Sequence, residues 1–102
     1  MSWINVSYHS DQVYVVQESA ILDSIKLCFA NNKQIKLVNR PRISIDSKRN
    51  NCYIFLDVKV KLNSNKKVNV IIKELTKSIE TSVKKLINIT PKNIQISLLS
   101  LY

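Results

Sequence analysis

Apolar residues in the C-terminal third of the chain recur at steps of three and four, the spacing of an amphipathic helix. Because an α-helix turns once every 3.6 residues, side chains at these steps lie along one face. That face consists of Val68, Ile72, Leu75, Ile79, Val83 and Leu86. Asn88 tolerates the left-handed conformation that ends many helices, and Pro91 cannot continue a helix. The pattern therefore predicts a helix from about Val68 to Ile87.

Strict alternation of apolar and polar residues predicts strands on both sides of this helix. The clearest stretch runs from Tyr53 to Leu62, where every second residue from Ile54 onwards is apolar. A polar turn connects it to residues 43–46, and the two stretches together predict a β-hairpin. Residues 94–98 alternate in the same way and predict a closing strand.

The N-terminal part of the chain predicts one strand, one helix and one short strand. Residues 13–16 are rich in β-branched and aromatic side chains, which favours a strand. Residues 18–30 carry one apolar face, which predicts a helix, and residues 35–37 alternate briefly. Residues 1–11 also alternate, so we treat them as an N-terminal segment that can form an extra strand. Residues 12–102 are then a single domain.

The order of these elements is strand, helix, strand, strand, helix, strand. A helix with one apolar face must cover something, and the strands supply a sheet for both helices. We therefore expect an α+β fold, a two-layer sandwich in which one sheet carries both helices on one face. The length of 102 residues suits one domain with one core.

The chain is strongly basic, with a formal net charge of +9 from 16 Lys and Arg residues against 7 Asp and Glu. This sign favours phosphate-rich partners such as nucleic acid or an anionic membrane surface. The abundance of Lys, Asn and Ile is equally typical of a protein from an AT-rich genome, and both interpretations stay open.

The densest basic segment lies between residues 33 and 49. If the hairpin forms, its side chains are expected to cluster at one end of the sheet as a contact surface for an anionic partner. A solvated charged loop is the alternative interpretation, since exposed charge runs are ordinary. The basic residues of the segment are Lys33, Lys36, Arg40, Arg42, Lys48 and Arg49.

Tyr53 and Phe55 stand on the non-core face of the predicted long strand. Aromatic side chains there can stack bases beside Lys59 and Lys61, as on sheets that bind RNA. They can also cover one end of the sheet or meet a partner subunit, which is common for aromatic residues on strands. We favour the second interpretation and treat Tyr53 and Phe55 as a partner or self-association surface.

The sequence is poor in residues that carry catalytic chemistry. It has no glycine, so it cannot form a Walker loop, a dinucleotide fingerprint or the Gly-x-x-Gly clamp of a KH domain. One histidine, His9, and two cysteines, Cys28 and Cys52, give neither a catalytic motif nor a zinc spacing. We expect no enzyme activity, no catalytic residue, no cofactor, no metal site and no small-molecule substrate. The cysteines are expected to be reduced structural thiols.

The expected location is the cytoplasm. No apolar run approaches the roughly 20 residues that cross a membrane, and the N-terminus lacks the pattern of a signal peptide.

From about Gln12 to Leu101 the chain resembles the alkaline shock protein family, the Gls-type general stress proteins. The resemblance lies in a strand and apolar-faced helix from Val13 to Phe29, a long alternating strand from Tyr53 to Leu62, and an amphipathic helix from Val68 to Ile87. A closing alternating strand, Ile94 to Leu98, completes it. Asn31-Asn32 and Ile87-Asn88 stand where the family usually has glycine.

The resemblance implies a non-enzymatic protein, linked to cell-envelope stress, that acts through protein–protein contacts. Some members of the family are held near the membrane by an anchoring partner. We therefore expect a small cytoplasmic stress or envelope-associated binding or scaffold protein, peripheral to the membrane through such a partner. It would self-associate or dock through a sheet edge or a surface such as Tyr53 and Phe55. The alternative function is a small basic RNA- or ribosome-associated protein, whose binding would fall steeply with salt.

Overall fold

The computed structural model describes residues 2–9, 11–62 and 66–102, apart from the side chains of Tyr8 and His9. Within these residues the chain forms two helices and six strands, which confirms the α+β class. The elements are β1 (Trp3–His9), β2 (Gln12–Gln17), α1 (Glu18–Ala30), β3 (Ile35–Leu37), β4 (Arg42–Ile45), β5 (Cys52–Val60), α2 (Val68–Ile87) and β6 (Asn93–Leu101).

Strand β5 is the centre of the sheet that the described strands β3 to β6 form. On one side it pairs antiparallel with β3 near Val60 and with β4 near Cys52. The predicted hairpin is confirmed, with Ile43 of β4 opposite Ile54 of β5. On its other side β5 pairs in parallel with β6, because α2 returns the chain to the start of the sheet before β6 begins.

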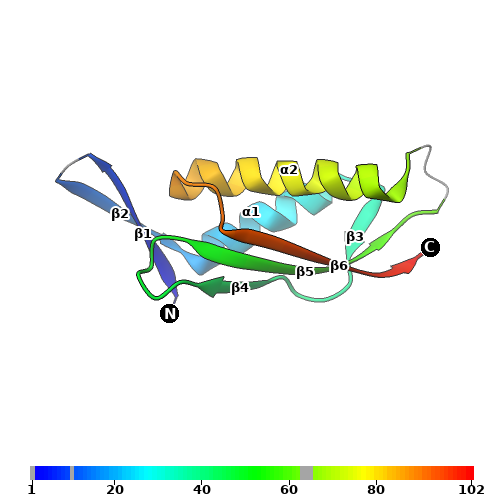
Figure 1. Cartoon of the computed structure of the whole chain (residues 1–102), viewed down its shortest axis with the longest axis horizontal. Coiled ribbons are helices and arrows are strands. Elements are labelled where there is room, and N and C mark those ends of the chain that lie inside the picture. Colours follow the sequence, from blue (N-terminus) through cyan, green and yellow to red (C-terminus); the bar gives the residue numbers. More distant parts are fainter. Residues whose placement is uncertain (1, 10, 63–65) are drawn as a thin grey trace.

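Strands β1 and β2 form a separate antiparallel sheet, which differs from the prediction of a single sheet. Both sides of β5 are already occupied by β3, β4 and β6, so the hairpin has no position beside it. Figure 1 shows the hairpin projecting past the end of α2. The N–H of Asn5 donates to the carbonyl of Arg49 at 2.7 Å, and Ile4 and Val6 are buried. The N-terminal segment is therefore part of the core.

The two helices lie within the predicted bounds and end in different ways. Asn88 closes α2 in the left-handed conformation, with φ 60° and ψ 22°, and its N–H donates to the carbonyl of Lys84 at 2.8 Å. This confirms its expected role. At the end of α1, Asn31 has φ −88° and is not left-handed. There the N–H of Asn32 donates to the carbonyl of Phe29, which tightens the last turn.

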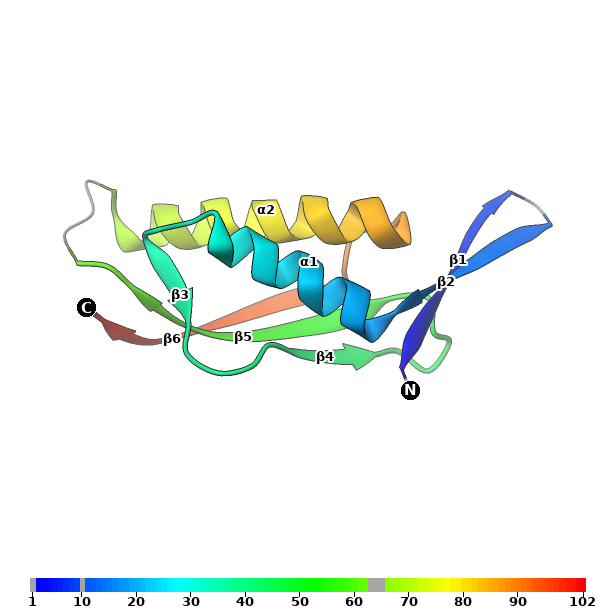
Figure 2. The ribbon, with the colours of Figure 1, turned by 180° about the vertical axis from the view of Figure 1, so that it is seen from behind.

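Both helices pack on the same face of the main sheet, as the two opposite views in Figures 1 and 2 show. The buried stripe of α2 is centred on Ile79 and is turned slightly from the predicted one, since Val68, Ile72 and Leu86 are only half-buried. The buried residues of α2 are Ile71, Leu75, Ile79, Val83 and Ile87. No described element covers the opposite face of the sheet, so one face is core and the other faces solvent.

Candidate functional site

The uncovered face of the main sheet is the first of two candidate surfaces. Along β5, Cys52, Ile54 and the alternate residues up to Val60 are buried beneath the helices, so the intervening side chains point to the other face. The register places Arg42 and Gln95 on either side of Phe55. We define the open face as Lys36, Arg42, Ser44, Tyr53, Phe55, Asp57, Lys59, Asn93, Gln95, Ser97 and Tyr102.

Lysines stack on aromatic rings at both ends of the open face. The ammonium nitrogen of Lys59 lies 4.8 Å from the centroid of the Tyr102 ring, and that of Lys36 lies 5.8 Å from it. At the other end, the ammonium nitrogen of Lys92 lies 5.8 Å from the centroid of the Tyr53 ring. These separations are within cation–π range. The open face thus carries aromatic rings and positive charge together.

Asp57 is the one acid among the residues of the open face, and it is already paired. Its Oδ2 accepts from Arg42 Nη1 and from Asn39 Nδ2, both at 3.0 Å, and its side chain is only 12% exposed. The hydrogen bond from Arg42, followed by that from Asn39, lowers the pKa of Asp57 below its ordinary value and outweighs the effect of burial. Asp57 is therefore ionised at neutral pH and neutralised by Arg42.

The ion pair of Asp57 makes stability depend on pH. Since the folded state lowers the pKa of Asp57 below the ordinary value of 3.8, the pair stabilises the fold above that value. The contribution is lost as the pH falls through the folded-state pKa. Asp57→Asn is expected to lower the urea midpoint at neutral pH, and the difference from the wild type should shrink as the pH falls below about 4.

The control for this prediction is Asp23→Asn, which removes an exposed carboxylate on α1. It should leave the neutral-pH midpoint unchanged. Wild type and Asp57→Asn with equal midpoints at neutral pH would show that the pair does not stabilise the fold.

The basic residues predicted to cluster do not lie at one end of the sheet, so that prediction was wrong. Strand β3, with Lys36, pairs with the Val60 end of β5, whereas the turn with Lys48 and Arg49 precedes its Cys52 end. Nine residues of strand separate these ends by about 30 Å. The prediction failed because β3 and β4 pair with different halves of β5, which residue spacing does not reveal.

The remaining members of the basic segment have separate surroundings. Lys33 follows α1 in an exposed loop, and Arg40 is exposed between β3 and β4. Arg49 stacks its guanidinium over the ring of Trp3, 4.0 Å from the centroid, and so ties the turn to the N-terminal hairpin. Of the six residues, only Lys36 and Arg42 belong to the open face.

The second candidate surface is the outer edge of β6, which we call the free edge. Among the described strands β6 pairs only with β5, and it extends from Asn93 to Leu101, beyond the predicted 94–98. No residue of β6 is charged. Leu98, Leu99 and Leu101 are exposed, and a bulge in the pairing interrupts the register at this end. The free edge therefore presents unpaired backbone groups beside apolar side chains.

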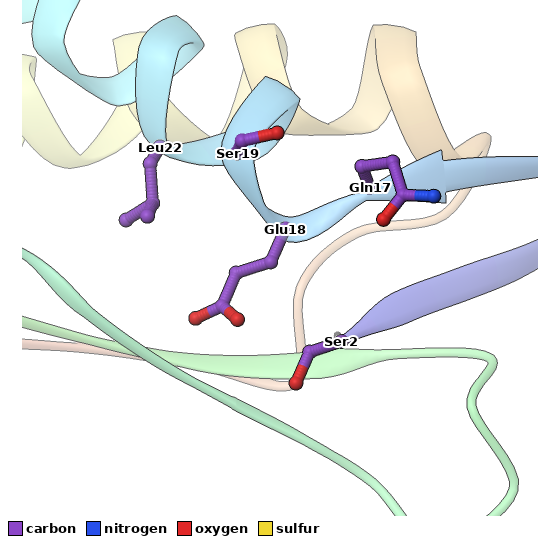
Figure 3. Close-up of a pocket in the computed structure, with 5 residues that line it drawn as sticks. All are labelled: Ser2, Gln17, Glu18, Ser19 and Leu22. Carbon is purple, nitrogen blue, oxygen red and sulfur yellow. The ribbon is translucent and has the colours of Figure 1, made fainter.

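A shallow hollow of about 330 Å³ lies at the start of α1. Figure 3 shows Glu18 and Leu22 reaching from α1 towards it, with Ser2 across from Glu18. Glu18 is the one ionisable side chain among the lining residues Ser2, Gln17, Glu18, Ser19 and Leu22. The lining of this hollow holds a single carboxylate, so it offers no pair of carboxylates.

The cysteines are free thiols in the described structure. Cys52 is buried in the core, and burial, reinforced by nearby Asp46, raises the pKa of its thiol to about 11. Cys28 is half-buried, with Sγ 3.4 Å from Ser82 Oγ. His9 is the last residue of β1, and its side chain lies outside the described residues. In the described parts of the chain, no group of three or more His, Cys, Asp or Glu side chains is placed to hold a metal ion.

Two further observations complete the description. Among the described helices, none combines the length and the apolar character that crossing a membrane requires. Comparison of the chain with protein-family models, curated proteins and solved structures finds no match. The resemblance to the alkaline shock family therefore stays a prediction.

Sequence reasoning found Tyr53 and Phe55 on the correct face of β5 but missed Tyr102 and the free edge. Tyr102 reaches Lys36 and Lys59 only because the bulge shifts the end of β6 by one residue, and no sequence signal marks that bulge. The sequence could have indicated the free edge, since the run from Asn93 to Leu101 is uncharged in a chain of net charge +9.

Proposed function

We propose that this chain is a non-enzymatic binding or scaffold protein that acts through protein–protein contacts. Its partner adds an extended segment along the free edge of β6. The observation that carries the proposal is that edge: nine residues long, uncharged, and lined at one end by exposed Leu98, Leu99 and Leu101.

Within the described structure, the outer side of β6 presents unpaired backbone groups. An edge strand presents a row of N–H and C=O groups that can pair with another chain, and proteins normally protect such edges with charges, proline or a covering element. Strand β6 has no charge and no proline. The bulge near Leu98 and Leu99 leaves the part from Asn93 to Ser97 regular, so backbone pairing is expected there. A segment paired along these residues would continue past the exposed leucines Leu98, Leu99 and Leu101 and contact them. Strand addition of this kind is a common mode of peptide recognition.

The sequence resemblance supports the same class of function. It points to a stress-type protein that works at the cell envelope through contacts with other proteins. We place this chain in the cytoplasm, peripheral to the membrane through a partner that anchors it.

The proposal is tested by placing a charge on the free edge. Leu99→Lys is expected to weaken capture of protein partners from a native lysate, because pairing along β6 would bring the ammonium group into an apolar contact. The matched control is Leu27→Lys, which makes the same substitution at an exposed leucine of α1. Leu99 is 53% exposed and Leu27 is 64% exposed, so neither change should disturb the core.

The capture is done after nuclease treatment and read by quantitative mass spectrometry. Partners lost with Leu99→Lys and kept with Leu27→Lys support the free edge as the binding site. Sedimentation of the purified wild type and Leu99→Lys tells whether a second copy of the chain is such a partner. Equal capture by wild type, Leu99→Lys and Leu27→Lys would rule out the free edge.

A further inference from the structure

We propose that the open face is a second binding site, for a short single-stranded nucleic acid. Two features of the open face point to this ligand: adjacent aromatic side chains, and lysines at both ends of the row that they form. The site lies on the face of the sheet opposite the helices, which pack together on the other face (Figure 2). It shares Asn93, Gln95 and Ser97 with β6, but it uses their side chains, whereas the free edge offers the outer backbone groups of that strand.

The aromatic part of the site is formed by Tyr53 and Phe55. They are two residues apart on β5, so their side chains leave the same face about 7 Å apart. Tyr53 is 36% exposed and Phe55 is half-buried. Two rings at this spacing can stack two successive bases of an extended strand, since every base has a π-face. Arg42 and Gln95 lie on either side of Phe55 and offer donors to base edges or phosphates.

The charged part of the site extends the row in both directions. Lys92 lies at the Tyr53 end, and Lys36 and Lys59 lie at the far end beside Tyr102. From Tyr53 to Lys59 the row is about 20 Å long, enough for a few nucleotides. Asp57, the one acid of the open face, is paired with Arg42, and Lys92 lies 3.6 Å from Asp46 Oδ2 in the neighbouring turn. The surplus positive charge of the row therefore comes from Lys36 and Lys59. The row is therefore positive overall and complementary to a phosphate backbone.

Two properties of the chain restrict the kind of recognition. Because the sequence has no glycine, no Gly-rich loop can bring backbone N–H groups close to phosphates, and side chains must supply the contacts. A sheet face with two exposed or half-buried rings also suits unpaired bases rather than a duplex, whose bases are already stacked. The expected ligand is a single strand bound with little dependence on sequence.

The test uses fluorescence anisotropy with labelled pyrimidine-rich RNA and DNA of about ten nucleotides. The purified full chain is titrated at salt concentrations between about 50 and 200 mM. Lys36→Ala with Lys59→Ala removes two cations from the open face. The matched control, Lys73→Ala with Lys77→Ala, removes the same charge from the exposed side of α2. For the open-face pair, the slope of log affinity against log salt is expected to fall by about 1.4. For the control pair it should stay near the wild-type value.

Stacking is tested separately from charge. Tyr53→Leu keeps an apolar side chain but removes the ring, and it is expected to weaken binding at least about fivefold. Tyr53→Phe keeps the ring and should bind like the wild type. Circular dichroism melting of each variant shows that the loss of affinity is not a loss of folding.

The outcomes distinguish binding of the strand at the open face from its attraction by the net charge of the protein. A reduced slope for the open-face pair, together with rescue by Tyr53→Phe, supports the site, and the RNA and DNA titrations show which strand it takes. Equal weakening by the two lysine pairs would mean attraction by net charge alone and would overturn the proposal, as would no binding at the lowest salt. Leu99→Lys should leave this binding intact, so failure of the free edge and failure of the open face are distinguishable.

Discussion

Ile79→Asp is expected to destabilise the fold severely. Ile79 lies in the middle of α2, has no exposed surface, and packs in the layer between the helices and the sheet. Aspartate there would bury a charge that has no partner, at a cost of about 4 kcal/mol or more in the free energy of unfolding. That cost is a large fraction of the total stability of a small domain, about 5–15 kcal/mol. Urea unfolding followed by circular dichroism measures the change.

The control for this prediction is the neighbouring residue on the same helix. Ser78 is exposed, so Ser78→Asp introduces the same charge without burying it and should change the stability by less than about 0.5 kcal/mol. A cooperative transition of Ile79→Asp near the wild-type midpoint would mean that α2 does not present this face to the sheet.

Ile4→Ala is expected to have the second-largest effect, a loss of about 3 kcal/mol. Ile4 is completely buried, although it lies in the N-terminal hairpin outside the main sheet. Truncation removes buried apolar area and leaves a cavity that the hairpin cannot fill without leaving its position against the helices. Thermal and urea unfolding should both show a single transition at lower midpoints, because hairpin and main sheet share one core.

The exposed face of the same hairpin provides the control. Val13 on β2 is 60% exposed, so Val13→Ala should be nearly neutral. If Ile4→Ala and Val13→Ala were equally stable, the hairpin would be an appendage rather than part of the core.

Local patterns predicted the elements of this fold well. The steps of three and four gave the bounds of α2, and Asn88 acts as its left-handed end as expected. The alternation around Ile54 gave the inward and outward residues of β5. These features depend on neighbouring residues, which sequence reasoning can use directly.

Pairing between distant segments was harder to predict. Strands β1 and β2 pair with each other rather than with the main sheet, although no described strand occupies the outer edge of β6, and no local pattern marks that choice. The expected basic cluster failed for the same reason, since Lys36 and Arg49 reach opposite ends of β5. A charge pattern along the chain cannot show such a division.

The two candidate surfaces differ in how far the sequence indicated them. Tyr53 and Phe55 were placed on the correct face by alternation alone. The same alternation placed Lys59 on this face. Lys92 and Lys36 could not be placed beside it, because Lys92 comes from the loop before β6 and Lys36 from β3. The free edge depends on β6 being the last strand on its side of the sheet, which only the topology shows.

We propose above all that this chain binds proteins through the free edge. The most direct measurement is a tagged capture from native lysate, divided and run with and without nuclease, for the wild type and Leu99→Lys. We expect protein partners that survive nuclease with the wild type and are lost with Leu99→Lys. If every partner of the wild type vanished with nuclease, nucleic acid would hold the complexes together, and protein binding at β6 would be contradicted.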